Sequence, residues 1–141
     1  MRILAFIVTL TTVSFAQTPA TTLPAPVKSA FDKAYPGATI AAVTEERENN
    51  RAVFRIDSTQ SGKRRQVRYD ANGTAIEIAE QVEEKDLPAP VAAAMHSHRR
   101  AIYVSGLKVT RGSNVEYRLT VRGSRKTAMV AKPDGTIVSF K

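Results

Sequence analysis

The chain has 141 residues, a formal net charge of +8 and no cysteine. This length allows one ordinary core or two small units and excludes two large independent domains. The lack of cysteine excludes disulfide bridges, so the burial of apolar side chains must stabilise the fold. The positive charge favours anionic partners over cationic ones.

The first sixteen residues have the pattern of a secretory signal peptide. Arg2 precedes an apolar run from Ile3 to Phe15, and the small residues Ser14 and Ala16 form a cleavage site. The apolar run is too short to span a bilayer, which needs about 20 residues. We therefore expect cleavage near Ala16 and an exported chain, periplasmic or secreted, with no transmembrane segment after cleavage. The alternative is an uncleaved N-terminal anchor.

Two nearly identical phrases, LPAPVKSAF from Leu23 and LPAPVAAAM from Leu87, begin two stretches of matching pattern. In each stretch, apolar residues recur at helical spacing, and in the first one Pro36 and Gly37 end the pattern. We expect the side chains of Thr22 and Asp86 to accept backbone N–H groups in the first turn of each helix.

Each predicted helix is followed by about four short strands. Apolar and polar residues alternate in VEYRLTVRG and VFRI, which places Phe54 and Tyr117 on an inward face. Turns rich in Gly, Asn and Asp separate the strands. AVFRID matches VEYRLT, and DANGTAIEI matches KPDGTIVSF, so the similarity extends along both stretches.

These patterns predict an α+β fold. It is a tandem repeat of a helix plus a four-stranded antiparallel sheet, with the helices on one face of the sheet. The predicted segments are a signal peptide (1–16), a first repeat (17–78), an acidic connector (79–86) and a second, basic repeat (87–141). The patterns leave open whether the two repeats form one continuous sheet.

The order LPxxVxxAFxxxYPGAxIxxVxxE, then VFRI, then VRYDANGTAIE resembles the PepSY-like, beta-lactamase-inhibitor-like (BLIP-like) family of small exported bacterial proteins. The likeness is strong from Leu23 to Ile78 and looser from Leu87 to Phe140, where SHRRAIYV replaces the YPGA phrase. The resemblance implies a tandem helix-plus-four-strand fold with helices on one face. It also implies that the opposite sheet face is free to meet a protein partner.

Positive charge is concentrated in the second predicted repeat. Residues 17–86 contain 10 Lys and Arg against 11 Asp and Glu, a net charge of −1, whereas residues 87–141 contain 10 against 2, a net charge of +8. We expect a binding surface formed by a second-half cluster of Arg111, Arg118, Arg122, Arg125 and Lys126. A first-half cluster of Lys63, Arg64, Arg65 and Arg68 is a secondary candidate. The alternative for both clusters is a role in solubility.

Catalytic chemistry is not indicated. His96 and His98 are the only histidines, and side chains two residues apart on a helix diverge, which argues against a metal site. The chain has no cysteine nucleophile and no G-x-S-x-G motif, and its paired carboxylates lie in polar connectors. We expect no enzyme activity, no cofactor and no bound metal.

The sequence therefore predicts a non-enzymatic exported binding module of the PepSY-like kind. It would engage an extracytoplasmic protein or acidic peptide, such as an enzyme that it inhibits or regulates, through the outward sheet face. The alternative is an envelope anion binder that docks on phosphorylated lipid or a polyanionic polymer through the basic second repeat. Nucleic acid is a weaker candidate, because the aromatic residues Phe54 and Tyr117 are expected to face the core rather than a base.

Overall fold

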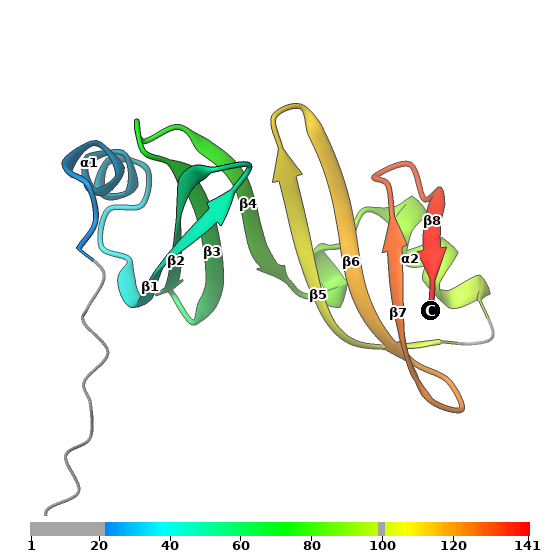
Figure 1. Ribbon diagram of the computed structural model, residues 1–141. Coiled ribbons are helices and arrows are strands. Elements are labelled where there is room, and N and C mark those ends of the chain that lie inside the picture. The colour runs from blue at the N-terminus through cyan, green and yellow to red at the C-terminus, as the bar shows by residue number, and fades with distance from the viewer. Residues whose placement is uncertain (1–21, 99–100) are drawn as a thin grey trace, which may run out of the picture.

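The computed structural model describes residues 22–98 and 101–141, and within these residues eight strands form one antiparallel sheet in chain order (Figure 1). The predicted signal peptide and its cleavage site near Ala16 lie outside the described residues. The first half of the fold consists of α1 (Ala25–Ala34), β1 (Thr39–Glu48), β2 (Arg51–Gln60), β3 (Lys63–Asp70) and β4 (Ala75–Val82). The second half consists of α2 (Ala89–Ser97), β5 (Ile102–Arg111), β6 (Asn114–Arg122), β7 (Lys126–Ala131) and β8 (Ile137–Phe140), and the 3-10 helix η1 (Glu84–Asp86) lies between the halves.

The predicted α+β class is confirmed, and the sheet is continuous because β4 pairs with β5. Tight turns join the strands within each half. Asn49 and Asn50 both have positive φ angles, 50° and 61°, which allows the two-residue turn between β1 and β2. The alternating strands and the Gly- and Asn-rich turns are therefore where the sequence pattern places them.

The two helices begin without side-chain caps, contrary to the expectation for Thr22 and Asp86. The N-cap residues are Pro24 and Pro88, and neither makes a side-chain hydrogen bond to its helix. A second proline lies in the first turn of each helix and has no N–H group, so fewer backbone donors there require a cap. Asp86 instead lies 3.4 Å from the ammonium group of Lys63.

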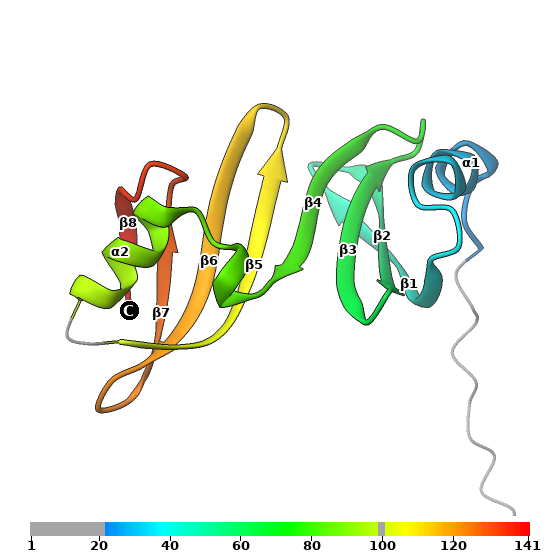
Figure 2. The same ribbon diagram turned by 180° about the vertical axis from the view of Figure 1, so that it is seen from behind.

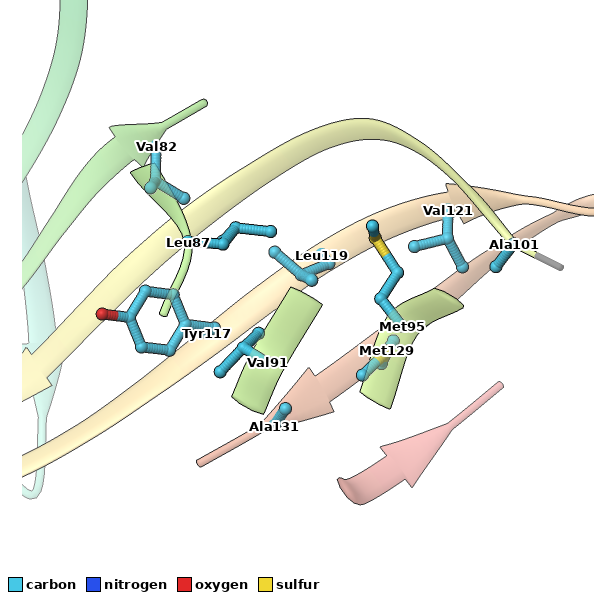
Figure 3. Packing of buried hydrophobic residues seen from close by; sticks show 10 residues of the cluster. All are labelled: Val82, Leu87, Val91, Met95, Ala101, Tyr117, Leu119, Val121, Met129 and Ala131. Carbon is cyan, nitrogen blue, oxygen red and sulfur yellow. The ribbon is translucent and has the colours of Figure 1, made fainter. Parts of the chain in front are cut away.

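Each helix covers its own apolar core. Val27 and Phe31 of α1 pack with Phe54 and Ile56, and all four side chains are buried. In the second half, Val91 and Met95 of α2 pack over β6 and β7 among the side chains that Figure 3 shows, which include Tyr117, Leu119, Val121, Met129 and Ala131. The inward positions predicted for Phe54 and Tyr117 are confirmed as buried.

Both helices lie on the same face of the sheet. Ile78 of β4 packs against the α1 core, and Val82 of the same strand belongs to the α2 core. Residues four apart on a regular strand point to the same side, and β4 pairs with β5 without a register shift from Ile78 to Val82. In the second half, α2 lies behind β6 and β7 in Figure 1 and in front of them in Figure 2.

The segment 79–86, expected to be a connector, has regular structure over most of its length. Ala79–Val82 forms the end of β4, and Glu84–Asp86 forms η1. Val82 pairs with Gly106 of β5, where a Cβ atom would lie only 2.7 Å from a methyl group of Leu119. The Tyr103 hydroxyl also donates a hydrogen bond to the Val82 carbonyl. The halves are thus joined by a closely packed strand pair.

Candidate binding face

The sheet face opposite the helices, here called the outer face, carries most of the candidate binding residues. Strand pairing aligns one residue from each of several strands in a row across this face. Gln81 pairs with Leu107, Leu107 pairs with Arg118, and Arg118 pairs with Val130. Arg64 joins the row through its backbone N–H, which donates to Gln81 Oε1 at 3.2 Å. Residues from both halves therefore meet on one surface.

On the outer face of the first half, arginines form ion pairs with glutamates of the same sheet. The Arg55 guanidinium lies 2.8 Å from Glu46, and the Arg68 guanidinium lies 2.6 Å from Glu48 and 3.3 Å from Glu46. Arg55 and Arg68 are direct cross-strand neighbours, an arrangement in which like charges repel unless counter-charges lie nearby. Glu46 contacts both guanidinium groups, so this region is internally neutralised.

The first-half cluster predicted from the sequence is not one surface. Arg65 points to the helix side, where its guanidinium lies 4.0 Å from the ring centroid of Tyr35 and 2.9 Å from Glu80. Arg68 is paired as described above, and Lys63 pairs with Asp86. Arg64 is exposed and has no acidic partner among the described residues. Adjacent residues of a strand point to opposite faces, which separates Arg64 from Arg65.

The second-half cluster is also divided. Arg118 and Arg122 share the outer face, but Arg118 lies 2.6 Å from Glu116, and Arg111 lies 2.6 Å from Glu77 and 3.4 Å from Glu116. The remaining members lie at the β6–β7 hairpin, and within the described part of the chain they have no acidic partner: Arg122, Arg125 and Lys126. Glu116 could have been foreseen, since it shares the outward side of VEYRLTVRG with Arg118.

A hollow opens in the outer face between the ion-paired regions, and we call it the central hollow. Its volume is about 640 Å³. Small residues form much of its lining, namely Ser105, Gly106, Thr120 and Ala128. Leu107 and Val130 add apolar surface, and Arg64 and Arg118 lie among the lining residues. A neighbouring hollow of about 540 Å³ shares Arg64 and Leu107 with it.

Aliphatic side chains are exposed at and near the central hollow. Leu107 is 40% exposed, and Ile102, which pairs with Arg122 on the same face, is 58% exposed. The charge pattern of the sequence does not indicate this site, because small residues form much of the hollow. The available signal was the outward series Ser105, Thr120 and Ala128 in three successive strands, and it required the strand register to be recognised.

The two histidines are not close to the central hollow. His96 lies 3.2 Å from Glu84, and the His98 ring lies 3.8 Å from the ring of Phe140, measured between centroids. Residues 22–98 and 101–141 contain no group of three or more His, Cys, Asp or Glu side chains that could hold a metal ion. Within the same residues, no helix is both long enough and apolar enough to cross a membrane.

No family model matches this chain, and no curated protein matches it. Solved structures do resemble it. A BLIP-like protein of Bacteroides fragilis is 20% identical with a TM-score of 0.65, and the match covers 89% of this chain and 88% of that one. A DUF2874 family protein of Bacteroides uniformis is 18% identical with a TM-score of 0.68, covering 84% of this chain and 88% of that one.

A third structure, from Bacteroides eggerthii, carries a provisional description as a periplasmic protein. It is 16% identical with a TM-score of 0.70, and the match covers 86% of this chain and 89% of that one. At sequence identities this low, the structural similarity shows that the folds are alike and does not show a shared activity. The resemblance that the LPxxV, YPGA and DANGT motifs suggest is therefore confirmed at the level of structure: this chain has the fold of the BLIP-like and DUF2874 proteins.

Proposed function

We propose that the protein is a non-enzymatic exported binding module, of the PepSY-like kind, that engages an extracytoplasmic protein through its outer face. Its two halves are interpreted as copies of one helix-plus-four-strand unit. Structural neighbours with BLIP-like and provisional periplasmic descriptions support an exported protein. Inhibition or regulation of an extracytoplasmic enzyme is one form that such binding would take.

One observation carries the proposal: a hollow lined by the exposed side chain of Leu107, with exposed Ile102 on the same face, opens on a sheet face that the helices do not cover. Replacing Leu107 and Ile102 by polar residues would not disturb either apolar core, because both side chains lie on the face opposite the helices. A clustered apolar surface with a polar rim is typical of a protein interaction site. In the first half, by contrast, Glu46 forms ion pairs with both Arg55 and Arg68.

The hairpin cations favour a second candidate function. Arg122, Arg125 and Lys126 lie together at one end of the sheet without acidic partners in the described residues, which suits an envelope polyanion or phosphorylated lipid. Such binding would depend on charge alone and would fall steeply with added salt. A protein partner that contacts Leu107 and Ile102 would retain part of its affinity.

The test places a photo-cross-linking amino acid at Thr120 in the central hollow or, as a control, at Lys28 on the exposed side of α1. We expect protein adducts from Thr120 and none from Lys28 when the variants are expressed in cells and exported. A Leu107→Asp and Ile102→Asp double change should abolish the Thr120 adducts without lowering the melting temperature, and Val138→Asp, an exposed aliphatic residue of β8, should not. Adducts from Lys28 alone would contradict the proposal. Loss of all adducts at high salt would favour the anion binder.

A further inference from the structure

We propose that the central hollow receives one aliphatic or aromatic side chain of the partner, and that acidic residues flank this side chain in the partner's sequence. The inference rests on the proposed function and narrows the chemistry of the partner. The evidence for it is the shape of the hollow and the charges around it.

The shape fits a protruding side chain rather than a flat surface. A volume of about 640 Å³ lies in the range of small-ligand pockets, so the open hollow has room for a large protruding side chain. Ser105 and Ala128 leave the space empty because their side chains are small. Gly106 lines the hollow with backbone alone, since a Cβ atom there would point to Leu119 and Val82 on the helix side. Leu107 supplies an apolar wall that is already exposed to water. Filling the hollow with an apolar group would therefore bury surface on both partners.

The charges around the hollow fit an acidic neighbour. None of the described residues that line the hollow is acidic, and two are arginines, Arg64 and Arg118. Arg64 has no acidic partner in the described chain, and Arg118 shares the single carboxylate of Glu116 with Arg111. Guanidinium groups bind carboxylates in a bidentate manner, which gives both strength and direction. Arg122 and Lys126 lie farther along β6 and β7 and extend the positive rim.

This combination favours a protein segment over a lipid or polyanion. Protein hot spots combine a buried apolar anchor with a surrounding rim that excludes water. A uniform polyanion would gain nothing from Leu107, and part of the positive charge that it would need is already paired, because Glu116 contacts both Arg111 and Arg118. A partner segment with an apolar residue between acids satisfies the hollow and the cations together.

The experiment selects ligands from a displayed library of random peptides against the full exported chain, followed by fluorescence anisotropy with synthetic copies of the enriched peptides. Two variants alter the site: Ala128→Phe fills the hollow, and Arg64→Glu reverses the charge at its rim. Two matched controls, Ala42→Phe and Arg51→Glu, make the same changes at exposed positions of the first half. Ala128 is also exposed, so the melting temperature of every variant should stay close to that of the wild type.

We expect enriched peptides with an apolar residue next to acids, and a loss of affinity of roughly tenfold or more in Ala128→Phe and in Arg64→Glu but not in the controls. Replacing the apolar residue of the peptide by Ser should weaken binding by a similar factor. No enrichment, enrichment of basic peptides, or equal binding to wild type and Ala128→Phe would overturn the inference.

Two further arms separate this inference from the proposed function. Vesicles of phosphatidylcholine and phosphatidylglycerol that bind the chain more tightly than any selected peptide would overturn the inference in favour of the anion binder. If the Thr120 cross-linker captures protein but Ala128→Phe does not disturb it, the outer face binds its partner without an anchor in the hollow. In that case the inference fails and the proposed function stands.

Discussion

Individual arginines of this sheet have different roles according to the face on which their strand places them. Arg65 stacks on Tyr35 at the helix side, Arg68 pairs with glutamates on the outer face, and Arg64 has no acidic partner in the described residues. All three arginines lie within five residues of the sequence, and their charge alone does not show which of them has an acidic partner. The strand period separates Arg65 from its neighbours, and only the register across β1 to β4 identifies the glutamates that pair with Arg68.

Tyr69 gives a prediction at the same scale. Burial raises the pKa of Tyr69 to about 12, and nearby Arg65 opposes this shift only in part. An unfolded tyrosine titrates near 10, so the folded state holds the proton at pH values where the unfolded state has lost it. The stabilisation is complete below about pH 10 and is lost as the pH rises from about 10 to about 12, with a slope of about 1.4 kcal/mol per pH unit.

We expect the free energy of unfolding, measured with urea between neutral pH and pH 11, to fall less steeply in Tyr69→Phe than in the wild type. Some slope should remain, because burial also raises the pKa values of Tyr35 and Tyr103. Identical slopes for the two proteins would show that the ionisation of Tyr69 does not contribute. Spectrophotometric titration of the phenol groups supplies an independent measurement.

At the scale of elements, the repeated phrase LPAP has a structural explanation. The β3–β4 turn contacts the first turn of α1, and the β7–β8 turn contacts the first turn of α2. A Cβ atom on Gly73 would lie 2.5 Å from the carbonyl oxygen of Pro26, and one on Gly135 would lie 2.6 Å from that of Pro90. The second proline of each phrase therefore meets the glycine of the repeated DANGT or KPDGT turn.

Substitution of these glycines should be costly. Both have positive φ angles, 83° for Gly73 and 87° for Gly135, and the clash is with backbone that cannot rotate away. We expect Gly73→Ala or Gly135→Ala to lower the free energy of unfolding by roughly 2 to 4 kcal/mol. Gly112→Ala is the control, since its φ is 57° but no atom lies within 4 Å of the added methyl group, and it should cost only about 1 kcal/mol. Chemical denaturation of the three variants checks the difference, and equal costs would contradict it.

The elements could be predicted because their signals are local. The helical spacing of Val27 and Phe31, the alternation around Phe54 and Tyr117, and the Gly and Asn turns each lie within a few residues. The candidate site could not be predicted, because it depends on pairing between distant strands. The Glu77 partner of Arg111 comes from the other half of the chain, and the small residues of the central hollow have meaning only in register.

At the scale of the whole molecule, two cores share one sheet but are packed separately. The buried residues form one cluster beneath α1 and another beneath α2. The strand pairs that connect the halves run from Ile78–Thr110 to Val82–Gly106. Each half alone would bury too little surface to be more than marginally stable. The β4–β5 junction therefore couples two units that would otherwise unfold at low cost.

This arrangement predicts that the halves lose protection unequally when one core is damaged. Phe54→Ala removes a buried ring from the α1 core, which should cost about 3 to 5 kcal/mol. Phe54 packs in the α1 core and is not part of the α2 core. Native-state hydrogen exchange should therefore accelerate at the amides of β2 and β3 much more than at those of β6 and β7. Leu119→Ala, which damages the α2 core, should give the opposite pattern. Strands β4 and β5 should respond to both changes, since each is paired across the junction. Equal acceleration in all eight strands for either variant would mean that the sheet unfolds as one cooperative unit, with the junction as strong as the cores themselves.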